Sequence, residues 1–314
     1  MLNIKKYPIY PLYEQKVSTE YKVEIQSLKE GEKPSIMSDT MFKTMFFNQN
    51  RIKYSCKFFS YFLEVSYEDL LMNLKLVKNE LDKEKEQTKG ERCDYVALIK
   101  DTYLNIEVNN NSGVEIMYRN VEYAFKQYAS KIKVGTKIND SNGKDYYMSV
   151  IQFNLNNFSF EGNDKIIDIY TLQNKEGFTL NDKIVIIQIY IPNLRKKCYN
   201  EGIKKLSELE RYLLTMVEPN FTKAGEIAKG FEIMEEYVDE SAKVITDINF
   251  GESYDKEWAL KDEYLREGME KGIIQGEKKK QIEIAKNMVK KGIDAKTISE
   301  CTNLSHEEIE SLME

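Results

Sequence analysis

The stretch RCDYVALIKDTYLNIEVNNN, residues 92–111, decides the fold class of this chain. Two apolar runs of strand type flank a central Lys-Asp pair, and this pattern predicts a β-hairpin with a two-residue turn. Each run also carries an acid: Asp94 lies near the start of the first run and Glu107 near the end of the second. Burying a carboxylate costs free energy, so the two acids need a functional or structural reason.

A two-residue turn at this place fixes the register of the hairpin. Asp94 then lies directly opposite Glu107, and paired residues point to the same face of a sheet with Cβ atoms roughly 4.5–5.5 Å apart. Asn109 follows Glu107 by two residues and shares that face, with Arg92 across from it. Lys-Asp is not a preferred turn pair, so a shifted register, which would move a whole strand's side chains to the other face, stays open.

Two interpretations of the paired acids compete. In the first, the hairpin lies at the edge of the sheet, water solvates both carboxylates, and Arg92 partly neutralises them. In the second, the acids hold a cation. The apolar neighbours of both acids make solvation harder and favour the cation.

Composition limits the chemistry that is available. The chain has 314 residues, 41% of them hydrophobic, and a net charge of -6, so any surface that binds nucleic acid must be locally basic. Its single histidine, His306, lies near the end of the chain. This excludes zinc sites with several histidine ligands and Ser-His-Asp triads. A metal site in this chain would use mainly oxygen ligands, which favours a hard cation such as Mg²⁺.

Cysteines and apolar segments indicate a cytoplasmic protein. The four cysteines show no CxxC spacing and no disulfide framework, and are expected to be reduced thiols. The first residues lack an apolar core of signal-peptide length. The longest strongly apolar run, IVIIQIYI at 184–191, is too short to cross a bilayer as a helix.

Helical and strand patterns alternate along the chain after an N-terminal extension of residues 1–33. Their order is helix, strands, helix, strands, helices, which predicts a mixed α/β core over residues 34–240. The first expected helix begins near Ser38. Further helices are expected over 53–64, 114–135 (ending at Gly135), 203–217 and 223–240. The expected strands, besides the hairpin, lie in 70–80, 146–155, 166–173 and 183–191, the last in the interior of the sheet.

A charged helical arm is expected over residues 241–280. Gly268, Gly272 and Gly276 recur every four residues on one face of this helix. The preferred interpretation is an arm that tolerates each glycine at a cost of about 1 kcal/mol. The alternative is a close helix contact, for example between subunits.

The tail, residues 281–314, is expected to form three short helices. Gly292 would end the first, Asp294 would cap the second, and Ser305 with Glu308 would form a capping box for the third. This arrangement resembles a helix-turn-helix. Six acids oppose one lysine from residue 294 onward, and such a surface repels phosphates. We therefore expect a packing or protein-interaction module and not a DNA reader.

The spacing from Asp94 to Glu107-Val108-Asn109 looks like the PD-(D/E)XK nuclease signature. From Ser38 onward the chain resembles the Rpn/YhgA-like recombination-promoting nucleases, the PD-(D/E)XK nuclease family transposases. The segments that carry the resemblance are SDTMFKTMF, RCDYVAL, NIEVNNN, YRNVEYAFKQY, VIQFNLNNF, YIPNLRKKCYNEG, FGESYDKEWALKDE and IAKNMVKKGIDAKTISECTNLS. The resemblance implies a restriction-endonuclease-like αβββαβ core. It also implies a Mg²⁺-dependent endonuclease, with Mn²⁺ able to substitute, that cleaves double-stranded DNA.

By motif position, the resemblance assigns metal binding to Asp94 and Glu107, with Asp39 as the acid supplied by the first helix. Asn109 stands where the family has lysine, and it brings hydrogen bonds but no positive charge. The remaining candidates are cations that could contact DNA phosphates: Lys43, Arg119 and Lys126.

Each weaker candidate has a structural alternative. Asp39 is a good helix cap, and Arg119 could pair on its own helix with Glu115 or Glu122. Three further expectations accompany the resemblance: a link to recombination or mobile elements, a homodimer through the nuclease domain or the arm, and no membrane contact.

Two other functions stay open. A three-acid transposase of the RNase H type fits the acid-bearing hairpin and the tail poorly. A degenerate nuclease fold acting as an interaction or regulatory protein fits Asn109 and the acidic net charge.

Overall fold

The computed structural model consists of two compact units, Met1–Asp255 and Lys256–Glu314. Each unit is described by itself. The residues that the structure describes are 15–25, 27–77, 94–111, 113–131, 138–139, 145–146, 148–174 and 176–313.

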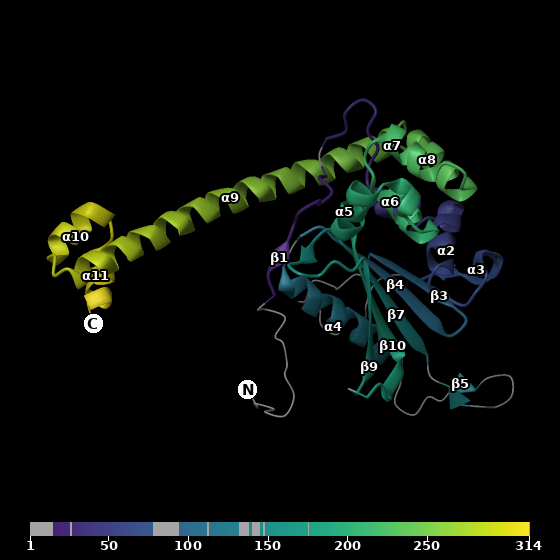
Figure 1. Ribbon diagram of the computed structural model, residues 1–314, viewed down its shortest axis with the longest axis horizontal. Coiled ribbons are helices and arrows are strands. Elements are labelled where there is room, and N and C mark those ends of the chain that lie inside the picture. The colour runs from purple at the N-terminus through teal and green to yellow at the C-terminus, as the bar shows by residue number, and fades with distance from the viewer. Residues whose placement is uncertain are drawn as a thin grey trace. The chain divides into compact units, whose positions relative to one another are not determined.

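A six-stranded mixed sheet forms the centre of the first unit (Figure 1). The strand order is β2-β3-β4-β7-β10-β9; β4, β7 and β10 run parallel, and the other neighbours are antiparallel. The strands are β2 (Lys75–Leu76), β3 (Tyr95–Ile99), β4 (Thr102–Asn109), β7 (Ser149–Asn156), β9 (Ile167–Gln173) and β10 (Thr179–Tyr190). Two short pairs lie outside this sheet: β1 (Val17–Ser18) with β8 (Ser159–Phe160), and β5 (Ile138–Asn139) with β6 (Asp145–Tyr146).

The β3–β4 hairpin has the predicted register. Tyr95 pairs with Ile106, and Ile99 pairs with Thr102 across the turn. Lys100 in the turn has φ 53°, in the left-handed region that non-glycine residues seldom occupy. The two-residue turn is therefore confirmed, although its sequence is an unusual one for such a turn.

Helices cover both faces of the sheet (Figure 1). α4 packs on one face, where Ala124 contacts Ile184 and Ile186 of β10. The other face packs against the remaining helices of the first unit, which include α1 and α2. The helices are α1 (Asp39–Met45), α2 (Ile52–Ser60), α3 (Tyr67–Asn73), α4 (Val114–Lys131), α5 (Ile191–Glu201), α6 (Glu208–Val217), α7 (Phe221–Ala228) and α8 (Glu232–Val244). Two 3₁₀ turns, Gln49–Arg51 and Ile203–Lys205, join them.

Strand alternation builds the main core. Ile106 of β4 and Phe153 of β7 point to the α1–α2 face and are fully buried. Phe58 and Phe59 of α2 pack on Phe153 with ring centroids 5.2 and 5.5 Å apart. Burying each such side chain contributes about 1.5–3 kcal/mol. The order of helices, β2–β4, α4 and β7 is the expected αβββαβ core.

Local predictions differ from the structure at several boundaries. The helix expected over 53–64 ends at Ser60. The strand expected within 70–80 is present but short, as the two residues of β2, and residues 70–73 belong to helix α3, which Ser66 caps. The expected helix end at Gly135 lies outside the described residues. β10 lies between β7 and β9, as expected for an interior strand.

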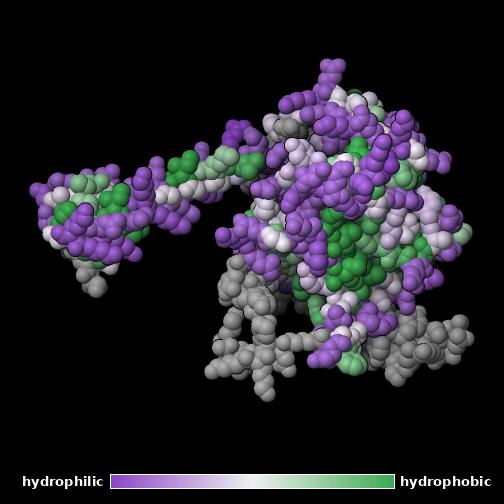
Figure 2. Space-filling view, in the orientation of Figure 1, coloured by the Kyte–Doolittle hydropathy of each residue, from purple (hydrophilic) through white to green (hydrophobic). Residues whose placement is uncertain are grey.

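The second unit contains helix α9 (Ile248–Lys290) from Lys256 onward, with α10 (Ala295–Thr302) and α11 (His306–Met313). Ala285, Ile298, Leu304 and Ile309 form its small core. The predicted caps are confirmed: the Thr297 N–H donates to Asp294 Oδ1 over 3.0 Å, and Ser305 and Glu308 bond reciprocally. The first of the three short helices predicted in the tail is instead the end of α9, since helix continues through the glycines. Figure 2 shows hydrophobic residues exposed along α9.

Cysteines and hydropathy give two plain results. Cys56, Cys198 and Cys301 are free thiols, and Cys93 lies outside the described residues. No helix in the described part of the chain is long and apolar enough to cross a membrane.

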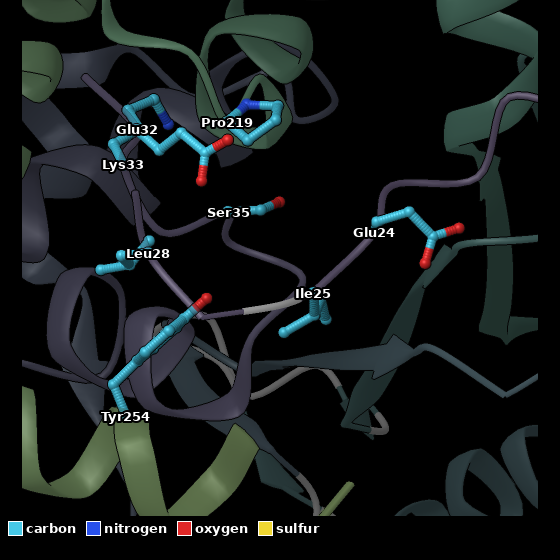
Figure 3. Close-up of a pocket in the computed structure, with 8 residues that line it drawn as sticks. All are labelled: Glu24, Ile25, Leu28, Glu32, Lys33, Ser35, Pro219 and Tyr254. Carbon is cyan, nitrogen blue, oxygen red and sulfur yellow. The ribbon is translucent and has the colours of Figure 1, made fainter. Parts of the chain in front are cut away.

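Lys33 is buried in the first unit, beside a cavity with room for about one water (Figure 3). Its Nζ donates to the Met216 carbonyl at the end of α6 over 3.2 Å and lies 5.3 Å from the centre of the Tyr237 ring. Burial lowers the pKa of this ammonium to about 7, although Glu218 acts to raise it. Lys33 therefore donates a hydrogen bond to a carbonyl at the end of α6.

Lys33 makes stability depend on pH. Its pKa is near 10.5 in the unfolded chain and about 7 in the fold, so between these values the unfolded chain binds more protons. The free energy of unfolding should therefore rise with pH from about 7 to 10, by at most about 1.4 kcal/mol per unit. Urea denaturation at pH 7 and 9 should show this rise in the wild type and a flatter dependence in Lys33→Met. The exposed Lys29→Met is the control and should retain the wild-type slope.

Candidate active site

The carboxylates of Asp94 and Glu107 lie together at one end of the hairpin. The Asp94 N–H donates to Glu107 Oε1 over 3.1 Å, and the Val108 N–H donates to Asp94 Oδ2 over 2.9 Å. Each acid is thus tied to the backbone of the opposite strand. These bonds help to offset the repulsion of two like charges, because a backbone N–H stabilises a carboxylate. Arg92, the expected partial partner, lies outside the described residues.

Asp39 and Lys43 stand at the edge of this site on α1. Ser38, not Asp39, caps the helix by accepting the Met41 N–H over 3.2 Å. Asp39 instead forms an ion pair with Lys43, with Nζ 2.7 Å from Oδ2 and both side chains about half exposed. The capping alternative for Asp39 is therefore wrong.

Asp94 has a raised pKa, about 6 instead of the usual 3.8. Burial is the largest cause. The Val108 N–H lowers the pKa, Asp39 raises it, and the charges of Lys43 and Arg119 lower it. Asp39, Lys43 and Arg119 are thus within electrostatic reach of Asp94.

Arg119 of α4 bonds to Asn109. Its Nη2 donates to Asn109 Oδ1 over 3.1 Å, and its guanidinium carbon lies 5.7 Å from the centre of the Tyr123 ring. The ion pair with Glu122 belongs instead to Lys126, with Nζ 2.7 Å from Oε1. Lys126 lies two helical turns, roughly 10 Å, along α4 from Arg119. The hydrogen bonds therefore bring Arg119, and not Lys126, to the site.

Buried amides continue from Asn109 across the sheet under α4. Asn109 Nδ2 donates to Asn156 Oδ1 over 2.9 Å, and Asn156 Nδ2 donates to Gln188 Oε1 over 2.8 Å. Each side chain in this row donates to the next, from the charged Arg119 through Asn109 and Asn156 to Gln188. This row holds Asn109 in one orientation, with its oxygen toward the guanidinium.

A second row of amides lies beside Glu107. Asn105 donates to Gln152 and Gln152 donates to Asn154, each over 3.1 Å. Asn154 pairs in register with Glu107, so both side chains share a face. In the described part of the chain, Asn154 Nδ2 is buried without a hydrogen-bond partner. Sequence reasoning missed these rows, although VIQFNLNNF places Gln or Asn at every second residue of β7.

The donor set suits a hard cation. Among the described residues, no three acidic, histidine or cysteine side chains lie close enough to hold a metal ion. Asp39 is paired with Lys43, and its place beside Asp94 and Glu107 in a metal site stays a prediction. Mg²⁺ commonly takes one or two carboxylates and completes its shell with waters and phosphate oxygens. Asp94 and Glu107 fit that description, and the donors fit zinc poorly.

Comparison with known families gave two matches. The family model of the PD-(D/E)XK nuclease family transposases matches residues 36–263. The model of the C-terminal HTH domain of the Rpn/YhgA-like nuclease family matches residues 278–314. This second match confirms the helix-turn-helix resemblance of the tail and weighs against an exclusively protein-binding module. No curated protein and no solved structure gave a significant match.

Neutralising Asp94 should stabilise the metal-free protein above pH 6. The folded pKa, about 6, exceeds the usual 3.8, so ionisation of Asp94 lowers stability as pH rises through this interval. Asp94→Asn keeps a hydrogen-bond acceptor for Val108 and should raise the free energy of unfolding by about 1–3 kcal/mol at pH 8. The gain should nearly vanish at pH 4. Denaturation in EDTA measures it, and equal gains at both pH values would contradict the assignment.

Proposed function

The chain belongs to the PD-(D/E)XK nuclease family transposases, and we propose that it is a metal-dependent endonuclease that hydrolyses phosphodiester bonds of double-stranded DNA. The observation that carries this proposal is the pairing of Asp94 with Glu107 beside Arg119. Two carboxylates and neighbouring cations are the groups that bind a hydrated metal and a phosphate.

Asp94 and Glu107 would hold Mg²⁺, or Mn²⁺ in its place. When bound, such an ion lowers the pKa of its water and neutralises charge that develops on the phosphate. Lys43 would compete with the ion for the carboxylate of Asp39. We therefore assign Asp39 a smaller contribution than the other two acids.

The cations would bind the phosphate backbone. The guanidinium of Arg119 presents several donors that can hold a phosphate through two bonds, and Asn109 orients it. We propose that Arg119 supplies the positive charge that an asparagine at position 109 does not. Lys43, half exposed beside Asp39, would contact a phosphate of the same DNA strand as Arg119.

Partners and biological role follow from the two matched domains. HTH domains suggest DNA binding, since many dock their second helix in the major groove. Here the last helix, α11, carries Glu307, Glu308 and Glu310, so we attribute the phosphate contacts to the nuclease unit. A role in recombination or mobile elements, a cytoplasmic location and a homodimer are parts of the same proposal.

The second candidate is a degenerate nuclease that acts as an interaction protein. One observation favours it: Asn109 is hydrogen-bonded to Arg119 and Asn156, and it brings no positive charge of its own to the acids. Metal-dependent cleavage distinguishes the two candidates.

Removing either paired acid should abolish cleavage. With Mg²⁺ or Mn²⁺ the wild type should nick or cut plasmid DNA, and EDTA should stop it. Asp94→Ala and Glu107→Ala should each lower the rate by orders of magnitude, because a metal ligand is lost, and Asp39→Ala should lower it less. Asp182→Ala, an exposed acid on β10, is the control and should cut normally. Equal residual cleavage by wild type and Asp94→Ala across metals and pH would favour the interaction protein.

Arg119 and Asn109 should act as a pair. Arg119→Ala should slow cleavage by roughly 10- to 100-fold, as expected when one charge-assisted phosphate contact is lost. Asn109→Lys alone should give little gain, because the new ammonium lies against Arg119. The double variant Arg119→Ala/Asn109→Lys should recover part of the lost rate. Initial rates of plasmid nicking measure all three variants. A double variant no faster than Arg119→Ala would contradict the proposal that a lysine at position 109 can replace the charge of Arg119.

A further inference from the structure

Within the described residues of the second unit, the middle of α9 packs against no other element. Residues 263–277 are exposed on every side, and a Cβ added at Gly268, Gly272 or Gly276 would meet nothing. Three interior glycines lower the intrinsic stability of this helix. Exposed ion pairs such as Glu267–Lys271 offset only a small part of that loss. Because packing supplies most helix stability in proteins, we expect another protein surface to pack against this segment and cover it.

Residues spaced alternately four and three apart form a stripe along α9, here called the seam: Trp258, Asp262, Leu265, Met269, Gly272, Gly276 and Lys279. Only Trp258, Leu265 and Met269 of this seam are large and apolar, so it is not a regular apolar heptad repeat. Leu265 and Met269 are 61% and 66% exposed, and Figure 2 shows hydrophobic residues on this part of the chain. The first half of the seam is bulky and the second half is glycine. A partner that fits it must offer glycine against the bulky half and bulk against the glycine half.

Charge has the same asymmetry along α9. Residues 252–270 carry seven acids and three bases, whereas residues 271–291 carry seven lysines and two acids. A partner that complements this pattern is basic where the helix is acidic and acidic where it is basic. The reversed helix itself has this charge pattern.

We propose that α9 pairs with α9 of a second copy of this chain in antiparallel orientation. In one register, Met269 lies against Gly272 of the second copy, and Leu265 against its Gly276. The same register sets Asp262 against Lys279 of the second copy. A parallel pair would instead place bulk on bulk and acid on acid. This pairing specifies how the homodimer proposed above would form, and it does not depend on nuclease activity.

The charges argue against DNA as the cover. The acidic half of the helix would repel phosphates along the whole bulky part of the seam. A different protein, or another part of the same chain, would not require the reversed charge and size pattern. These occupants are distinguished by the experiment below.

Charge exchange tests the register in the full-length protein. Asp262→Lys and Lys279→Asp should each weaken self-association about tenfold or more, because each creates two like-charge contacts per dimer. An equimolar mixture of the two variants should dimerise again, since each acid then meets a lysine. Sedimentation equilibrium from 1 to 100 µM measures the dissociation constants. Glu267→Lys, on the opposite face, is the control and should associate as the wild type.

A glycine substitution separates packing from helix propensity. Gly272→Leu raises intrinsic helix stability, so a solitary arm would gain helical circular dichroism and keep its association state. An antiparallel pair would lose dimer, because leucine then meets Met269 of the second copy. A wild type that stays monomeric at 100 µM, or a variant mixture that stays monomeric, would overturn the proposal. Dimerisation of Gly272→Leu as strong as that of the wild type would do so as well.

Discussion

The need to satisfy polar groups buried between the sheet and α4 shapes the functional face of the first unit. Glu107 and Asn109 project from β4 into this layer and are buried. Amides from β7 and β10 join them, in a layer where an unpaired group costs about 1–3 kcal/mol. The hydrogen bonds that meet part of this demand also hold the acid pair and orient Arg119. Stability and preorganisation of the site therefore come from the same contacts.

On the opposite face of the sheet, apolar side chains pack against the helices. Ile106 and Phe153 pack against α2 through shape and area, with no hydrogen bonds to complete. Such a layer tolerates exchange among apolar residues of similar volume. The sheet thus separates an adaptable apolar layer from a directional polar layer, and the acids lie on the directional side.

The hairpin shows how far sequence reasoning reached. Its period of two and a two-residue turn were enough to place Asp94 opposite Glu107, because register is a local property. The bond from Arg119 to Asn109 was not predictable, since it joins α4 to β4 through a contact that no spacing rule encodes. The unpaired amide of Asn154 was missed for a similar reason, because its surroundings come from three strands. The continuity of α9 was missed since its glycines resemble a boundary when their neighbours are unknown.

The bond between Arg119 and Asn109 has a consequence for how these sequences diverge. A lysine at position 109 would place a second cation against the guanidinium, and loss of Arg119 would leave the asparagine oxygen without its charged donor. Each substitution alone passes through a less favourable intermediate, so the two positions are energetically coupled. Relatives with lysine at the position of Asn109 should therefore lack arginine at that of Arg119. An alignment that treats each column independently would misjudge which of them retain a working site.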